Sequence, residues 1–181
     1  MSSRWIVTAL GQDRPGIVAG VTEVLYKLGC NLEDSAMTRL ECEFTIMLIF
    51  SASPKVTEAK LTQAFAAAAK KLKLAIHTKP LTAKETAAPA KAGVPFVISM
   101  YGADRAGIVF QVAQALAKAH VNITDVHTHR SASGGPSLYA MLLEVEAPPK
   151  TTEQTLTAQL ASLAKKLGVE LSVRPSEAAV L

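Results

Sequence analysis

The chain has 181 residues, a length that fits one ordinary domain or two small ones. Hydrophobic residues make up 49% and charged residues 19%, which excludes wholesale disorder and leaves ample material for a buried core. The net charge of +4, from 19 basic and 15 acidic residues, is too small to mark a nucleic-acid binder by itself.

The N-terminal segment and the cysteine content predict a cytoplasmic protein without membrane contact. Residues 1–5 lack the apolar region of a signal peptide, and no uncharged apolar stretch reaches the ~18 residues that suggest a membrane span. Two cysteines, Cys30 and Cys42, are too few for a disulfide framework. We expect both to be small buried residues in a reducing compartment.

The chain contains an internal repeat, because residues 5–18 reappear as residues 96–109. The repeat predicts one domain over residues 1–82 and a second over 95–181, joined by an Ala-, Pro- and Lys-rich linker at 83–94. The second copy is longer, and we assign most of its extra residues to a turn at 134–136. Copies this small are expected to pack on each other or on a second chain, and we expect a homodimer.

Taken in chain order, each copy predicts strand, helix, strand, strand, helix and strand. In the first copy these are Trp5–Leu10, a helix from Ile17 ended by Gly29, strands after Asn31 and over Phe44–Phe50, a helix over 57–73 and Ala75–Lys79. In the second copy they are 96–101, a helix from Ile108, strands after Asn122 and over 138–145, a helix over 152–167 and 169–173. This is the α+β, ferredoxin-like βαββαβ order, twice. It predicts antiparallel sheets with the helices on one face and the other face free to meet a neighbour.

The segment Gly-x-Asp-Arg-x-Gly turns the first strand of each copy into its first helix. We expect Asp13 and Asp104 to be N-caps. A helix N-terminus also presents unpaired N–H groups that suit a carboxylate, and Gly16 or Gly107 lets a ligand approach the backbone. The simpler interpretation assigns these residues to capping and turn formation alone.

Arg14 and Arg105 follow these aspartates and carry positive charge at a helix end where it is unfavourable. They are interpreted as solvated residues or as members of ion pairs at a domain interface. An anionic ligand is a weaker alternative.

Three segments of the first copy resemble the ACT domain, a regulatory module that senses amino acids: Ala9–Val18, Gly29–Ser35 and Glu43–Leu48. Asn122–Asp125 repeats part of the pattern in the second copy. Two such copies covering nearly the whole chain look like the glycine cleavage system transcriptional repressor family. The ACT segment of formyltetrahydrofolate deformylases is also similar, but the catalytic domain of those enzymes is absent here.

The resemblance implies a non-catalytic regulator that binds a free amino acid, foremost glycine, and contacts a transcription activator. It implies neither a cofactor nor direct contact with nucleic acid. In ACT proteins an asparagine at the start of the second strand often serves a ligand held between neighbouring domains, and its amide offers both donor and acceptor. The candidate ligand-binding residues are Asp13, Gly16, Ile17, Asn31, Asp104, Gly107, Ile108 and Asn122.

Other functional classes find weaker support. Asp125, His127 and His129 share one strand face by period two, a pattern that metal triads use, but we favour an exposed or interface face and expect no metal. RNA-recognition modules share the strand order, yet their aromatic motif is missing. No Gly-x-Ser-x-Gly, P-loop or His-Glu-x-x-His motif indicates an enzyme. A constitutive interaction module without ligand binding stays open as the alternative function.

Overall fold

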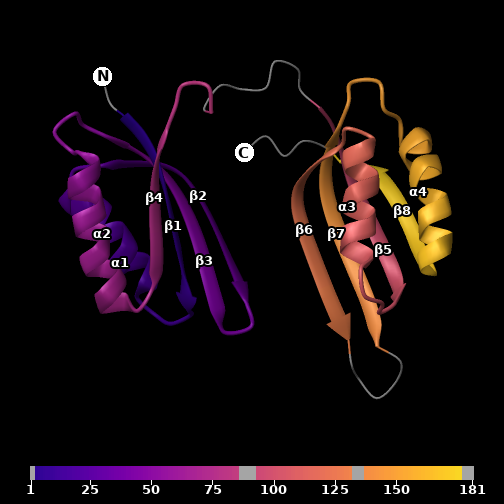
Figure 1. The fold of residues 1–181 in the computed structure, drawn as a ribbon, viewed down its shortest axis with the longest axis horizontal. Coiled ribbons are helices and arrows are strands. Elements are labelled where there is room, and N and C mark those ends of the chain that lie inside the picture. Colours follow the sequence, from indigo (N-terminus) through magenta and orange to yellow (C-terminus); the bar gives the residue numbers. More distant parts are fainter. Residues whose placement is uncertain (1–2, 86–92, 132–136, 177–181) are drawn as a thin grey trace. The chain divides into compact units, whose positions relative to one another are not determined.

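The computed structural model describes residues 3–85, 93–131 and 137–176, and its chain divides into two compact units, Met1–Ala88 and Pro89–Leu181. Each unit has the predicted βαββαβ order, so the ferredoxin-like fold is confirmed in both (Figure 1). The predicted turn at 134–136 and most of the predicted linker, residues 86–92, lie outside the described residues.

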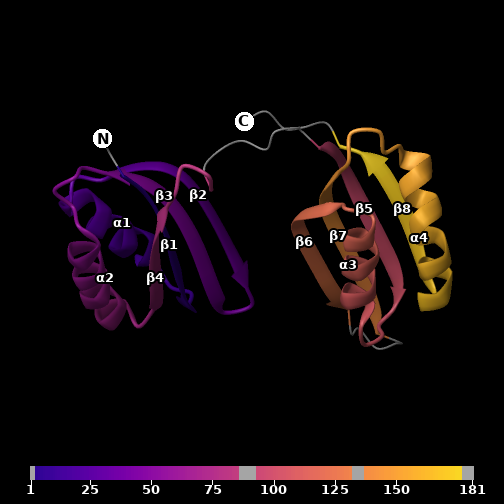
Figure 2. The same cartoon turned by 45° about the horizontal axis from the view of Figure 1, so that its top comes forward.

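The first unit consists of β1 (Ser3–Gln12), α1 (Ile17–Lys27), β2 (Asn31–Leu40), β3 (Glu43–Ala52), α2 (Glu58–Leu72) and β4 (Ala75–Leu81). Its sheet has the strand order β2-β3-β1-β4, and every neighbouring pair is antiparallel. Both helices cover the same face of this sheet (Figure 2). The opposite face, which we call the open face, carries no helix.

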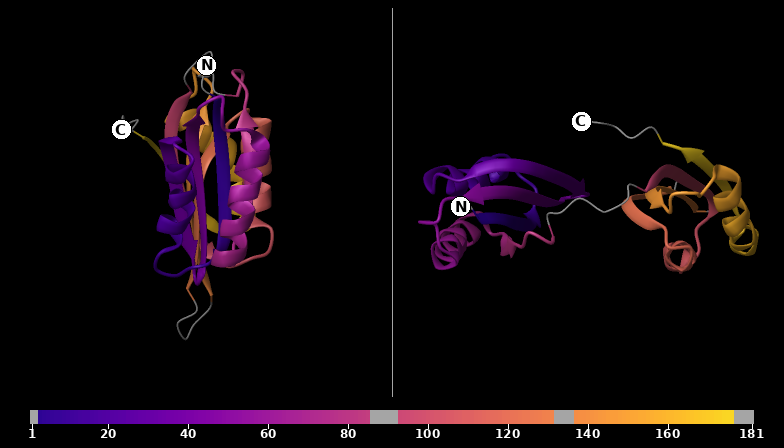
Figure 3. Two further views of the ribbon diagram at one scale, coloured as in Figure 1. Left: turned by 90° about the vertical axis from the view of Figure 1, so that its left-hand side faces the viewer. Right: turned by 90° about the horizontal axis from the view of Figure 1, so that it is seen from above.

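The second unit repeats this arrangement with β5 (Val94–Ala103), α3 (Ile108–Lys118), β6 (Asn122–Ser131), β7 (Leu138–Ala147), α4 (Glu153–Leu167) and β8 (Val169–Pro175). Its strand order is β6-β7-β5-β8, and its helices also lie on one side of the sheet (Figure 3). The two units differ at one hairpin. Residues 41–42 connect β2 to β3, whereas residues 132–137 connect β6 to β7.

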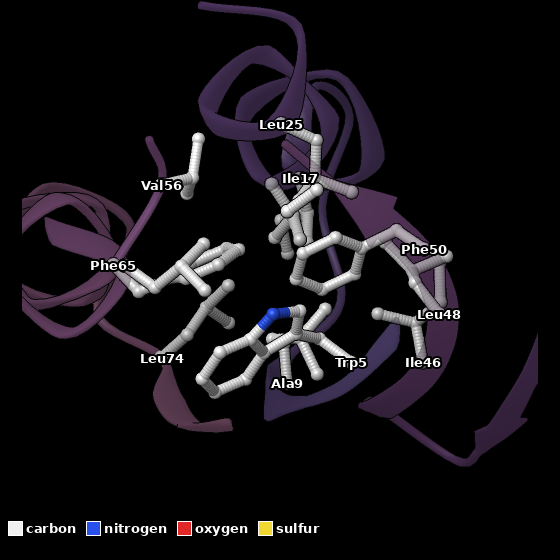
Figure 4. Close-up of a cluster of buried hydrophobic side chains, with 14 of the residues drawn as sticks. Trp5, Ala9, Ile17, Leu25, Ile46, Leu48, Phe50, Val56, Phe65 and Leu74 are labelled. Atoms are coloured by element: carbon white, nitrogen blue, oxygen red, sulfur yellow. The ribbon is translucent and has the colours of Figure 1, made fainter. Parts of the chain in front are cut away.

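The core of each unit lies between the helices and the sheet. Along β1 the buried residues alternate with half-buried ones, which is the period expected of a strand with one covered face. In α1 the residues Ile17, Val21 and Leu25 are buried, which is the spacing expected of a helix with one face on the core. Phe50 and Phe65 complete the apolar layer (Figure 4).

The two cysteines do not share the environment that the sequence predicted. Both are free thiols, but Cys30 is half-buried and Cys42 is exposed in the turn between β2 and β3. Burial raises the pKa of the Cys30 thiol above its ordinary value. The expectation of a buried residue was wrong for Cys42, because a two-residue hairpin turn has no interior to offer.

At two pairs of matching positions, one unit has a left-handed glycine and the other has a left-handed non-glycine residue. After the first helix these are Gly29 (φ 66°) and His120 (φ 56°). At the end of the second helix they are Lys73 (φ 53°) and Gly168 (φ 68°). Because a Cβ atom disfavours this conformation, Lys73 and His120 are each strained at a position where the other unit has glycine.

Replacing the strained residue by its glycine counterpart is expected to stabilise the chain. Lys73→Gly and His120→Gly should each raise the free energy of unfolding by about 0.5–1 kcal/mol, since the relief of strain exceeds the added entropy of the unfolded chain. Urea denaturation measures the change. Lys70→Gly, inside α2, is the control and should lower stability by about 1 kcal/mol. A loss of stability in both glycine variants would contradict the strain assignment.

Candidate functional site

The loop between the first strand and the first helix ends on a left-handed glycine in both units. Gly16 (φ 92°) is the N-cap of α1 and Gly107 (φ 86°) is the N-cap of α3. Neither helix has a side-chain cap or an acidic residue in its first turn. The first backbone hydrogen bonds run from Gly20 N to Gly16 O and from Gln111 N to Gly107 O. The N–H groups of the intervening first-turn residues therefore have no acceptor within their helices.

The second helix of each unit begins differently. The hydroxyl of Thr57 accepts from Lys60 N at 3.4 Å, and the hydroxyl of Thr152 accepts from Thr155 N at 3.2 Å. An acidic residue also stands in the first turn of each of these helices, Glu58 in α2 and Glu153 in α4. Capping side chains and carboxylates thus complement the N-termini of α2 and α4, whereas those of α1 and α3 lack both.

The expectation that Asp13 and Asp104 are N-caps was wrong, because both aspartates are held by the neighbouring hairpin. Asp13 N donates to Cys42 O at 2.7 Å, and its carboxylate lies 3.4 Å from Arg39 Nη1. Asp104 N donates to Ser137 O at 3.0 Å, and its carboxylate lies 3.0 Å from Arg130 Nε. These contacts fix the start of the loop and leave the cap position to glycine.

Arg39 and Arg130 were not among the residues predicted from the sequence. Each stands near the end of the second strand of its unit, β2 or β6, and pairs with the loop aspartate. A signal was present, since the two arginines occupy matching positions of the repeat. Without the register of the hairpin, nothing in the sequence indicated which acidic residue they contact.

Arg14 and Arg105 lie beside the end of the second helix in their units. The Arg14 guanidinium donates to the carbonyl of Leu72, the last residue of α2. The Arg105 guanidinium lies against Gly168, the C-cap of α4. A cation is favourable at a helix C-terminus and unfavourable at a helix N-terminus. The contact with the end of α2 or α4 therefore offsets the cost of placing each arginine near the start of α1 or α3. Each arginine thus has a partner within its own unit, without the ion pair at a domain interface that was one expectation from the sequence.

The remaining candidate residues separate into buried and distant groups. The side chains of Ile17 and Ile108 are only 2% exposed, so a ligand at the loop meets their backbone N–H groups alone. Asn31 pairs with Ser51, which pairs in turn with Arg4 near the start of β1. The loop follows Gln12, at the opposite end of β1. At the ~3.3 Å rise per residue of a strand, Arg4 and Gln12 are about 25 Å apart. One unit therefore does not bring its own asparagine to its own loop.

The predicted strand face of β6 contains one close pair. His127 Nε2 lies 2.8 Å from Asp125 Oδ2, and both side chains are exposed. Across the described residues, no group of three or more His, Cys, Asp or Glu side chains is placed to hold a metal ion. Within that same part of the chain, no helix is long and apolar enough to cross a membrane.

Sequence comparisons match both units to one family. The family model of the ACT domain matches residues 3–79 and 95–174. The glycine cleavage system transcriptional repressor of Escherichia coli K12 is 48% identical over 48 residues, which are 26% of this chain and 25% of that protein. A UPF0237 protein of Streptococcus mutans is 38% identical over 72 residues, which are 40% of this chain and 82% of that protein. The match to the repressor thus spans only about a quarter of its length.

Solved structures share the fold over almost the whole chain. An unknown protein from Galdieria sulphuraria matches with a TM-score of 0.81 and 23% identity, covering 98% of this chain and 100% of that one. A candidate glycine cleavage system transcriptional repressor matches with a TM-score of 0.75 and 18% identity, covering 98% and 99%. At these identities the likeness concerns the fold alone.

Alanine at the helix-start glycine tests the loop geometry. In Gly16→Ala the new Cβ meets no atom within 4 Å, so any loss of stability reports the left-handed backbone rather than a clash. We expect a loss of about 1–2 kcal/mol in the free energy of unfolding, measured by urea denaturation. Pro15→Ala, one residue earlier in the same loop, is the control and should change stability by less than about 1 kcal/mol. Equal stability of Gly16→Ala and the parent chain would refute the loop geometry.

Proposed function

The chain belongs to the ACT domain family, and we propose that it is a non-catalytic, cytoplasmic regulator that senses a free amino acid. The proposed ligand is glycine, bound at the loops that end on Gly16 and Gly107. The bound ligand alters contact with a protein partner, which we infer to be a transcription activator. The protein acts without a cofactor and without direct contact with nucleic acid.

One observation carries the proposal: the first helix of each unit starts on a bare glycine, whereas the second helix is capped. A free carboxylate can accept from the uncapped N–H groups after Gly16 and gains from the positive end of the helix dipole. The N-cap glycine has no side chain to occupy these groups, and the aspartate that precedes it pairs with Arg39 instead. The loop therefore has the features of a carboxylate site.

The ammonium group of the ligand needs acceptors from elsewhere. Asn31 and Asn122 are exposed and carry amide oxygens, but each lies at the far end of its own sheet. A ligand that contacts both a loop and an asparagine must therefore lie between neighbouring domains. This requirement supports association of the chain as a homodimer.

The choice of glycine rests on the repressor relative and on the size of the ligand. A carboxylate and an ammonium group are the only features of glycine that a site must recognise. The Escherichia coli protein that matches part of this chain is named for the glycine cleavage system and for transcriptional repression. We extend from that name the ligand and the activator partner. Ligand binding would favour one arrangement of domains that the partner distinguishes.

The second candidate function is a constitutive interaction module without a ligand. The distance between the loop and the asparagine within one unit favours it, since the pair is incomplete unless domains associate. In that case the glycines serve the backbone conformation alone.

A thermal-shift panel of all free amino acids separates the two functions. If the chain is a sensor, glycine should raise Tm with concentration, and stabilisation at one hundred times Kd amounts to about 2.7 kcal/mol. Asn31→Ala and Gly16→Val, checked for an intact fold by circular dichroism, should each lower the Tm shift, because each removes one of the two proposed sites. Ser51→Ala replaces the cross-strand neighbour of Asn31 and is the control that keeps it.

No response to any amino acid at millimolar concentration would contradict the sensor function and favour the interaction module. An unchanged response in Asn31→Ala would remove that residue from the site while leaving the sensor function in place.

A further inference from the structure

The open face of the first sheet carries a row of residues with opposite charges at its two ends. The row crosses all four strands through cross-strand partners, namely Asp34 on β2, Ile49 on β3, Ile6 on β1 and Lys79 on β4. Directly paired residues point to the same side of a sheet. Trp5 and Val7 flank Ile6 in the strand and are buried under the helices, so the row lies on the open face.

The next row adds an exposed apolar residue and a hollow. It contains Ala36, Met47, Thr8 and His77, and Met47 is 44% exposed. A shallow hollow of about 170 Å³ lies over Ala36 and is bounded by side chains of both rows. Apolar side chains at the centre and opposite charges at the edges are the features of an interface rather than of a solvated surface.

The matching row of the second unit also has an acidic and a basic residue at its two ends, but its central residues differ. It contains Asp125, Glu144, Val97 and Arg174. Glu144 therefore stands where the first unit has Ile49. Covering this carboxylate with a second sheet would bury a charge against an apolar partner, which is costly. The comparison selects the first open face as the one suited to being covered.

We propose that two copies of this chain associate through the open faces of their first units. The proposal rests on the homodimer included in the proposed function and names one contact surface for it. This contact keeps matching ends of the two sheets together, so it does not itself join a loop to an asparagine. Packed sheets lie about 10 Å apart with strands nearly aligned. A twofold axis parallel to the strands, between β3 and β1, sets Ile49 against Ile6 of the partner subunit. The same axis sets Asp34 against Lys79 of the partner subunit.

The second copy fits this face because the row is self-complementary. A twofold axis reverses the order of the strands, so the acidic edge of one sheet meets the basic edge of the other. Lys79 already contacts Glu85, and an ammonium group has three donors, so a further carboxylate can be accommodated. The reversal also places His77 of the partner subunit above Ala36, where the hollow lies.

Matched glutamate variants on the two open faces test the surface. Met47 and Leu142 occupy equivalent positions and are 44% and 41% exposed. In sedimentation equilibrium of the full chain, Met47→Glu should weaken dimerisation by about a hundredfold, because it buries an unpaired charge. Leu142→Glu is the control and should leave the dimer unchanged. Circular dichroism verifies the fold of both variants.

Charge reversal tests the predicted pairing directly. Asp34→Lys alone and Lys79→Glu alone each set like charges against each other and should weaken the dimer about tenfold or more. The double variant restores opposite charges and should recover most of the affinity.

Three outcomes would overturn the proposal: a monomeric parent chain, equal effects of Met47→Glu and Leu142→Glu, or no recovery in the double charge variant. The glycine thermal shift, recorded on the same samples, separates this failure from failure of the sensor. A monomer that still responds to glycine would reject the dimer surface and support the sensor function. A dimer that Met47→Glu disrupts but that does not respond to glycine would support the dimer surface and reject the sensor function.

Discussion

The left-handed glycine at the start of the first helix is the constraint from which the rest of the loop follows. Because Gly16 supplies the cap position without a side chain, the helix begins with unsatisfied N–H groups. Asp13 contacts the β2–β3 hairpin and Arg39 instead of these N–H groups. Arg14 donates to the carbonyl of Leu72 at the end of α2. The charged side chains of the motif thus contact neighbouring elements, and the backbone N–H groups of the helix start stay unoccupied by them. Gly107 has the same role in the second unit.

Periodicity and repetition were sufficient to predict the fold from the sequence. The apolar spacing of Ile17 and Val21 in the helix and the apolar runs of the strands are local patterns that can be recognised in the sequence. Each pattern occurs twice, once in each copy of the repeat. The N-cap assignment failed at Asp13 because aspartate is a common cap, and only the long-range contact with the hairpin shows that it serves elsewhere. The separation of Asn31 from the loop was equally hidden, since strand register is not a local property.

The two units share a backbone but differ at exposed positions outside the core. Lys73 stands in place of a glycine, and Glu144 stands in place of an isoleucine. Such differences leave the core intact, since the buried stripe of α3 matches that of α1. The duplicated fold therefore offers two similar loops with two different open faces, so the proposed ligand site and the proposed dimer contact lie on separate surfaces.

The most direct test of the central claim is amide NMR of the full chain during a glycine titration. If a carboxylate binds at the helix start, the backbone amides of Ile17 and Val18, or of Ile108 and Val109, should shift first and furthest, because they carry the uncapped N–H groups. Saturable shifts at these amides, absent with ethylamine (which has no carboxylate), are the predicted result. A chain whose loop amides stay unmoved at saturating glycine would contradict the account.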